Sequence, residues 1–285
     1  MLSILIVNWN TRDLLRACLT SLQRHLRDEY EIIVVDNASD DNSAQMVRDE
    51  FPQVHLIASD TNLGFAAGNN LAYQKARGAW IWLLNPDTEI DETSLPQVLN
   101  FLKKHPQCGA AASQLVDAKD GSTQRSCRTF PTPAALWCEA FRLAARYPRS
   151  RRFGFYRMGW WNYNETRQVD QPMASSLLLR REAIESSGGL FDENFPIYFN
   201  DVDLCWRLRE NNWEIWYVPQ SKVLHHGGAS TSQRKPEMIR ESHQSLERFY
   251  EKQYQGKLNP LIYNLTIALI RFGKWWRVKR ALKVG

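Results

Sequence analysis

Cysteine is scarce in this sequence, and the cysteines that are present form no metal-binding motif. The five cysteines are widely spaced and include no C-x-x-C pair, which argues against a zinc ribbon and against a disulfide framework. With 14 glycines and 12 prolines in 285 residues, the chain is not collagen-like either. Reduced thiols are typical of the cytoplasm, so we expect a cytoplasmic protein.

Long apolar runs are also missing. No stretch reaches the roughly 18 apolar residues that a membrane-spanning helix requires. Residues 1–10 (MLSILIVNWN) lack the basic start of a signal peptide, and we interpret them as a buried strand. Hydrophobic residues make up 44% of the chain and charged residues 24%, which is the balance of a globular protein.

Positive charge is concentrated at the carboxyl end. Six of the 36 lysines and arginines lie from Arg271 onward, where there is no acid, so the rest of the chain has 30 basic against 31 acidic residues. A nucleic-acid enzyme is expected to carry basic residues over its core as well. We therefore expect no nucleic-acid partner. The six cations are Arg271, Lys274, Arg277, Lys279, Arg280 and Lys283.

The first part of the chain alternates between short apolar runs and amphipathic segments. Four repeats of this alternation predict a parallel sheet with helices on both faces. Residues 121–170 lose the rhythm, which indicates a long loop or a helical insertion. A strand entering a helix is predicted at 171–184, acids at a helix start near residue 200, a strand at 213–219 and a helix at 236–254. The four apolar runs are 2–9, 31–39, 54–59 and 79–87.

Polar residues follow each of these runs. In parallel sheets, ligands bind at the carboxyl ends of the strands. The chain has no G-x-G-x-x-G after its first strand, which argues against a nicotinamide enzyme, and no G-x-x-x-x-G-K-[ST], which excludes a P-loop NTPase. The candidate residues at the strand ends are Asn8 and Asn10, Asp36 and Asn37, Asn62 and Gly64, and Asn85 and Asp87.

Two of these acids could bind a nucleotide. The carboxylate of Asp36 could accept the imide N–H of a uracil or thymine ring, or it could cap the next helix. Asp87, in the triplet Asn85-Pro86-Asp87, could hold Mg²⁺ or Mn²⁺ that bridges two phosphates, because these cations prefer oxygen ligands. The same triplet could be a simple turn.

Three residues of the second half are also candidates. Aromatic neighbours could desolvate Asp201 or Asp203 and raise the carboxyl pKa toward that of a useful base. Alternatively, both acids only stabilise a helix N-terminus. Their spacing places them on different sides of a helix, so we expect different roles. His225, in a glycine-rich turn, could be a metal ligand, a phosphate contact or a structural residue.

Taken together, six segments resemble glycosyltransferase family 2, especially its bacterial rhamnosyltransferase-like members that build cell-surface polysaccharide. They occur in the order of the family and cover residues 2–231. The segments are SILIVNWN, VVDNASDD, NLGFAAGNN, WLLNPDT, FDENFPIYFNDVDLCWRL and VLHHGGAST.

The resemblance implies the GT-A fold, which is a Rossmann-like α/β fold with a mostly parallel central sheet flanked by helices. A C-terminal helical segment would follow. It also implies inverting transfer of a sugar, with rhamnose as the family-level choice, from a dTDP- or UDP-sugar. The acceptor would be a hydroxyl of a cell-surface glycan or a polyprenyl-linked glycan. We divide the chain into a transferase domain at 1–235, with a nucleotide-sugar half (1–118) and an acceptor half (119–235), and a tail at 236–285.

The resemblance also assigns residues to the donor site. Asn8 and Asn10 would line the nucleotide pocket, and Asp36 would read the pyrimidine with Asn37 beside it. Asn62 and Gly64 would lie next to the nucleoside.

In the same way, Asn85-Pro86-Asp87 stands at the D-x-D motif of the family. Asp87 would then be its carboxylate ligand for Mg²⁺ or Mn²⁺. Asp201 would be the catalytic base, with Asn200 in place of the usual preceding acid. His225 would contact the metal or the diphosphate.

Two other functions are compatible with parts of the sequence. A sugar-nucleotide nucleotidyltransferase shares the α/β layout, but the first strand is not followed by a glycine-rich, basic phosphate loop. A nucleotide-sugar-binding subunit without activity is indicated by Asn85 and Asn200, where acids are usual. The retention of Asp87, Asp201 and His225 argues against it.

The C-terminal segment has the pattern of an interfacial helix. Residues 258–283 combine an apolar half, the pair Trp275-Trp276 and a basic end, which suits docking to anionic lipid on the cytoplasmic face of the inner membrane. Alternatively, the segment packs on the core or on a second subunit.

Overall fold

The computed structural model describes residues 1–27, 29–227 and 235–281. Its first part has the predicted alternation of strands and helices. Each of the first four strands is followed in the chain by a polar turn, and strands β1 to β4 pair in parallel. The elements are β1 (Leu2–Asn8), α1 (Arg12–His25), β2 (Tyr30–Asn37), α2 (Ser43–Glu50), β3 (His55–Ser59), α3 (Gly64–Lys75), β4 (Trp80–Leu84), β5 (Thr88–Ile90) and α4 (Ser94–Lys104).

The second half completes one mixed nine-stranded sheet, in the order β3-β2-β1-β4-β10-β6-β11-β5 with β8 paired to β11. Strand β10 is antiparallel to both of its neighbours, β4 and β6. The mostly parallel sheet that the resemblance implied is therefore interrupted at this strand. The further elements are β6 (Cys108–Asp117), β7 (Cys127–Arg128), α5 (Pro133–Ala140), α6 (Leu143–Arg146), β8 (Arg167–Gln168), β9 (Gln171–Pro172), β10 (Ser176–Arg180), α7 (Arg181–Ser186), α8 (Asn200–Glu210) and β11 (Glu214–His225).

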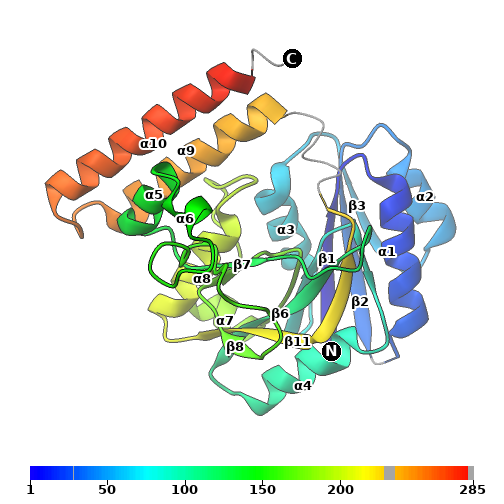
Figure 1. Cartoon of the computed structure of the whole chain (residues 1–285). Helices are drawn as coiled ribbons and strands as arrows, with labels where there is room; N and C mark the ends of the chain where they lie inside the picture. Colours follow the sequence, from blue (N-terminus) through cyan, green and yellow to red (C-terminus); the bar gives the residue numbers. More distant parts are fainter. Residues whose placement is uncertain (28, 228–234, 282–285) are drawn as a thin grey trace.

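Helices cover both faces of the sheet because alternate residues of each buried strand point to opposite sides. On β1, Ile4 and Ile6 pack with apolar residues of α1, α2 and α4. Leu5 and Val7 pack on the other face with residues of α3, α7 and α8. Figure 1 shows α1 and α2 on the side of the sheet opposite α3.

The tail is a helical hairpin formed by α9 (Lys235–Tyr254) and α10 (Pro260–Ala281). The predicted helix at 236–254 is confirmed. Phe249 and Tyr250 of α9 join Ile267 and Ile270 of α10 in a third apolar cluster. One face of the tail therefore packs on the core, as one of the two alternatives predicted. No helix in these described ranges is long and apolar enough to cross a membrane.

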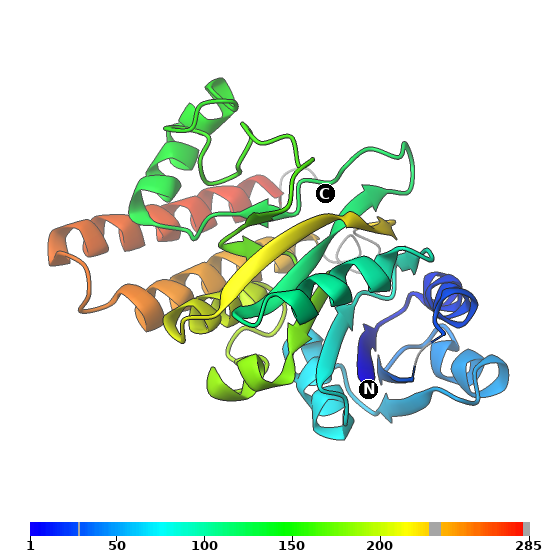
Figure 2. The ribbon, with the colours of Figure 1, turned by 90° about the horizontal axis from the view of Figure 1, so that it is seen from below.

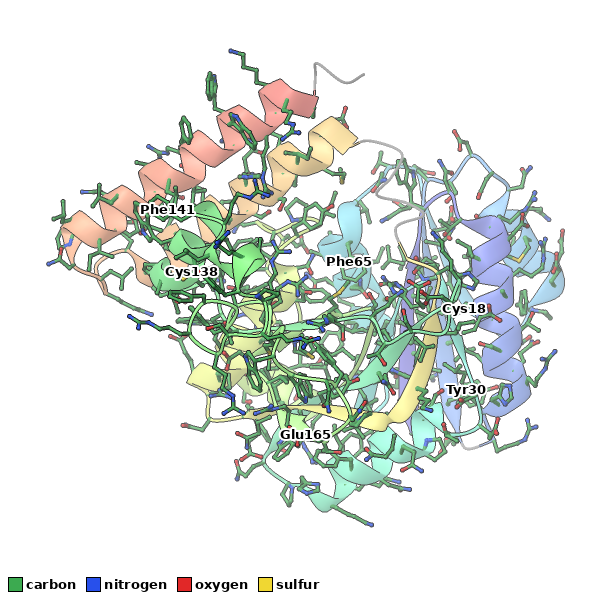
Figure 3. All side chains as sticks on the ribbon, in the orientation of Figure 1. Cys18, Tyr30, Phe65, Cys138, Phe141 and Glu165 are labelled. Carbon is green, nitrogen blue, oxygen red and sulfur yellow. The ribbon has the colours of Figure 1, made fainter. Side chains whose placement is uncertain are left out.

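The insertion at 121–170 contains the short helices α5 and α6 and several turns. Figure 2 shows α5 and α6 beside α10, on the opposite side of that helix from α9. In Figure 3, Cys138 and Phe141 lie on the α5 segment, far from Cys18 on α1. All five cysteines are free, as predicted from their spacing.

Candidate active site

The end of the first strand holds the carboxylate of Asp36 in a fixed position. Asn8 and Asp36 are partners across β1 and β2, and Asn8 Nδ2 donates to Asp36 Oδ1 at 2.8 Å. Ser39 donates to the same carboxylate through Oγ (2.7 Å) and through its backbone N–H (3.1 Å). Thr11 Oγ1 donates to Asn8 Oδ1 and so orients the amide. A carboxylate has about four lone-pair sites, so Asp36 keeps one for a ligand.

Asn10 and Asn37 support this site in different ways. Asn10 has a φ of 52° and accepts the N–H of Asp40 at 2.9 Å; its own N–H donates to Ser39 Oγ. Asn10 therefore braces the turn that carries Asp36. Asn37 Nδ2 donates to the carbonyl of Gly64 at 3.0 Å, while its buried Oδ1 has no hydrogen-bond partner among the described residues.

The loop before α3 connects the two halves of the site. Asn62 Oδ1 accepts the N–H of Gly64 at 2.9 Å. Gly64 has a φ of +82°, and a Cβ there would lie 3.1 Å from the carbonyl oxygen of Pro196. That same oxygen accepts the N–H groups of Phe65 and Ala66 at 2.8 and 3.0 Å. The start of α3 therefore docks on the segment that leads into α8.

Strand pairing brings Asp87 and His225 together. The short strand β5 pairs with the end of β11, and His225 lies opposite Thr88. His225 Nε2 is 3.4 Å from Asp87 Oδ1, and both side chains are nearly inaccessible to solvent. The next residue, His226, donates its backbone N–H to the carbonyl of Asp87 at 2.9 Å. His225 thus ends a strand, and the expectation that it lies in a glycine-rich turn is wrong. Residues 228–231 of the VLHHGGAST segment lie outside the described residues.

The side chains of Asp87 and His225 fit a site for a divalent cation. Asp87 Oδ1 is buried and has no hydrogen-bond partner among the described residues, and the same holds for Asn85 Oδ1. A buried carboxylate oxygen without a donor is unfavourable unless a ligand satisfies it. Two protein ligands suit Mg²⁺ or Mn²⁺, which usually keep waters and substrate phosphates as further ligands. The structure describes no group of three or more acidic, histidine or cysteine side chains that could hold a metal by itself.

The structure separates the roles of Asp201 and Asp203. Asp203 is fully buried and pairs with Arg207 (2.8 Å) and Lys252 (2.8 Å), and it accepts Gln253 Nε2 at 3.1 Å. Asp203 is therefore a structural anchor between α8 and α9. The two acids therefore have different partners, which agrees with the expectation that they do not share a role.

Asp201 has no such ion pair with a described residue. Its Oδ1 accepts the N–H of Val202 at 2.8 Å at the start of α8. Burial raises the pKa of the Asp201 carboxyl, and the hydrogen bonds from the backbone of Val202 and Ala174 reduce this shift. A carboxylate with a raised pKa is a stronger base than an exposed one.

Gln124 and Asp117 are polar neighbours of His225 that the sequence analysis did not identify. Gln124 Oε1 lies 2.7 Å from His225 Nδ1, and Gln124 Nε2 donates to Asp117 Oδ2 at 3.1 Å. They flank a tight turn in which Gly121 has a φ of +72°. The Asp120-Gly121 dipeptide is a hairpin signal and could have placed Gln124 beside the end of the preceding strand.

The chain matches the family model "Glycosyl transferase family 2" over residues 3–184. It belongs to glycosyltransferase family 2. As a member of this family, it is a glycosyltransferase. The matched region contains the Asp36 and Asp87 sites and ends before Asp201 and His225.

Two relatives extend the similarity over most of the chain. An N-acetylglucosaminyl-diphospho-decaprenol L-rhamnosyltransferase of Mycobacterium tuberculosis is 29% identical over 90% of this chain and 86% of its own length. The rhamnosyltransferase WbbL of Escherichia coli is 24% identical over 79% of this chain and 83% of its own length. Both alignments are longer than the region that the family model matches.

Solved structures of transferases share the fold. One is a mannosyltransferase of Pyrobaculum calidifontis in complex with GDP-Man and Mn²⁺. The match covers 99% of this family 2 chain and 73% of the mannosyltransferase chain, with 16% identity and a TM-score of 0.60. The match to TarS of Staphylococcus aureus in complex with UDP-GlcNAc covers 94% of this chain and 71% of the TarS chain, with 17% identity and a TM-score of 0.57. The fold is therefore GT-A, as the sequence motifs implied.

Proposed function

We propose that this glycosyltransferase moves rhamnose, with inversion, from a dTDP- or UDP-linked donor to a hydroxyl of a polyprenyl-linked or cell-surface glycan. The two rhamnosyltransferase relatives support the sugar. The acceptor of the mycobacterial relative, named as N-acetylglucosaminyl-diphospho-decaprenol, supports a polyprenyl-linked acceptor. The observation that carries the proposal is the Asp87 carboxylate oxygen beside His225, which has no hydrogen-bond partner in the described part of the chain.

In this proposal the halves of the transferase domain have separate tasks. Residues 1–118 bind the nucleotide sugar and residues 119–235 bind the acceptor, while 236–285 form the tail. Asp36 accepts the imide N–H of the pyrimidine with its remaining lone pair. Its three existing donors support this role, because they hold the carboxylate rigid without occupying it fully.

The other donor-site residues act around Asp36. Asn8 orients its carboxylate and Asn10 braces the turn. Asn37 Oδ1, which has no partner among the residues that the structure describes, accepts a hydroxyl of the nucleoside, and Asn62 and Gly64 form the loop beside it. Asn85, whose Oδ1 has no hydrogen-bond partner among the described residues, would contact the diphosphate together with Asp87.

The proposed chemistry uses Asp201 as the base. Asp201 takes the proton of the acceptor hydroxyl while that oxygen forms a bond to the anomeric carbon and the bond to the nucleoside diphosphate breaks. A single displacement of this kind inverts the anomeric centre. Asp87 and His225 would hold Mg²⁺ or Mn²⁺, which supplies charge neutralisation for the leaving diphosphate when it is bound. General base catalysis of this type typically contributes about 10²–10⁴-fold in rate.

We also propose that the protein is cytoplasmic and docks on the inner membrane through its tail. The free cysteines support a reducing compartment. The face of α10 that does not contact the core carries a stripe of exposed apolar side chains, including Phe272 (61% exposed) and Trp275 (56%). Lys279 Nζ and the Arg280 guanidinium lie over the rings of Trp275 and Trp276 at 4.9 and 5.5 Å. Aromatic rings with adjacent cations suit the headgroup region of an anionic membrane.

Calorimetric titration tests which nucleotide carries the donor sugar and whether its binding requires a metal ion. UDP and dTDP, and then their sugar conjugates, are titrated with and without Mn²⁺ into the wild type and into the Asp87→Asn variant. We expect one nucleotide to bind in a Mn²⁺-dependent way to the wild type and more weakly to the variant. Rhamnose transfer to an N-acetylglucosaminyl-diphospho-prenol then tests the sugar and the acceptor. Absence of nucleotide binding by the folded protein would contradict the proposal, whereas nucleotide binding without transfer would favour an inactive subunit.

A further inference from the structure

The side-chain amide of Gln124 has a fixed orientation. Its Nε2 lies 3.1 Å from Asp117 Oδ2 and 3.0 Å from the carbonyl oxygen of His225. Both of these atoms are hydrogen-bond acceptors, so the group that faces them must be the NH₂ of the amide. The amide oxygen of Gln124 therefore faces His225 Nδ1, at a distance of 2.7 Å.

This orientation decides which ring nitrogen of His225 carries the proton. An amide oxygen only accepts hydrogen bonds, so Nδ1 must be the donor in the contact with Gln124. In a neutral imidazole with a proton on Nδ1, Nε2 carries a lone pair. Nε2 is the ring nitrogen that lies 3.4 Å from Asp87 Oδ1. In this neutral form, two acceptor atoms face each other in a buried position, which is an arrangement that a cation between them would stabilise.

The neighbouring histidine has the opposite arrangement. His226 Nε2 lies 2.8 Å from Glu89 Oε1, and a carboxylate can only accept, so the proton of His226 is on Nε2. Two adjacent histidines are therefore held in different tautomers by different partners. The difference comes from the hairpin that carries Gln124, because Gln124 is the residue that contacts the ring of His225 at Nδ1.

We propose that Gln124, oriented by Asp117, is a positioning residue that fixes His225 in the Nδ1–H tautomer and so presents the Nε2 lone pair beside Asp87 to a divalent cation. This inference rests on the proposed metal site. Gln124 itself would touch neither the cation nor the substrate. Partners of this kind typically account for about 10–100-fold in metal affinity.

Nitrogen NMR of the metal-free full-length protein tests the tautomer directly. Long-range ¹H–¹⁵N spectra distinguish a ring protonated at Nδ1, at Nε2 or at both. We expect His225 as Nδ1–H and His226 as Nε2–H in the same wild-type spectrum. Finding His225 as Nε2–H, or with both nitrogens protonated at pH 8, would overturn the proposal without any variant.

A pair of matched variants tests the role of Gln124. Gln124→Met removes the amide that contacts His225. Gln114→Met makes the same change on the preceding strand, where the amide donates to Thr123 Oγ1 instead. We expect Gln124→Met to shift His225 away from Nδ1–H and to weaken Mn²⁺ binding, measured with dTDP or UDP present, by about 10–100-fold. Gln114→Met should change neither quantity. Unchanged tautomer and affinity in Gln124→Met would contradict the proposal.

Asp117→Asn is a conservative variant. Its amide oxygen can still accept from Gln124 Nε2, which also donates to the carbonyl of His225. We therefore expect the Nδ1–H tautomer to be retained in Asp117→Asn. The tautomer is measured without metal, so it also separates the two proposals: a wild type with the expected tautomer but no Mn²⁺ binding would contradict the metal site alone.

Discussion

His225 Nε2 lies 3.4 Å from Asp87 Oδ1, although the two residues belong to different halves of the chain. The contact exists because β5 pairs with the end of β11, which places His225 opposite Thr88. The carboxylate oxygen has no hydrogen-bond donor among the described residues. Asp201, at the start of α8, is the basis of the first three predictions below.

Replacing Asp201 should slow transfer strongly and preserve binding of the nucleotide sugar. In Asp201→Asn the amide oxygen can still accept the N–H of Val202, so the start of α8 should keep its structure. The variant lacks a base, and we expect kcat to fall by about 10²–10⁴-fold. Initial rates and nucleotide calorimetry measure the two effects. Unchanged transfer would remove Asp201 from the mechanism.

The raised pKa of Asp201 has a consequence for stability. A carboxyl whose pKa is higher in the folded state stabilises the fold fully below its unfolded pKa, and this stabilisation is lost as pH rises through the folded value. Burial causes the increase at Asp201. We therefore expect Asp201→Asn to have a higher Tm than the wild type at pH 7, with the difference shrinking at acid pH. Thermal unfolding from pH 4 to 8 measures this, and a lower Tm at pH 7 would contradict it.

The same shift predicts the pH dependence of activity. The base must be ionised to accept a proton, so kcat/KM should fall as pH decreases through the pKa of Asp201. Because that pKa is raised, the fall should begin at a higher pH than for an exposed aspartate. A pH–rate profile in the wild type measures the midpoint. A midpoint at or below the ordinary aspartate value would contradict the prediction.

Asp203 should matter for stability rather than for chemistry. Its removal leaves Arg207 and Lys252 without their buried partner, which typically costs about 3–5 kcal/mol. We expect Asp203→Ala to lower the free energy of unfolding by about that amount in urea denaturation. Asp13→Ala is the matched control, because its pairs with Arg12 and Arg16 are exposed and should change stability by less than about 1 kcal/mol. Equal effects would contradict the assignment.

The tail should bind anionic membranes through its exposed aromatic residues. We expect the wild type to float with phosphatidylglycerol vesicles at low salt and to be released at high salt, because the attraction is screened. Trp275→Ala/Trp276→Ala should weaken flotation strongly. Light scattering of the wild type and of the same variant tests whether this face binds a second subunit instead. A wild type that is dimeric and does not bind vesicles, with a monomeric variant, would favour a second subunit on this face.

Much of the fold could be predicted from local patterns. Apolar periodicity and polar residues at element ends predict the buried strands that end at Asn8, Asn37 and Leu84 and the helix that begins at Asn200. The position of Asp201 at a helix start was predicted in the same way. The glycines that follow His225 predict a turn at this residue, whereas cross-strand pairing with Thr88 extends β11 to it.

The sequence by itself determined the strand–helix alternation, the family motifs and the polar residues at the strand ends, because these depend on neighbours along the chain. Only the tertiary structure decided that β10 enters the sheet antiparallel, that Asp203 is held by Arg207 and Lys252, and that Gln124 orients His225. These relationships join residues that are distant in sequence. They depend on strand pairing and helix packing, which leave no periodic signal in the local sequence.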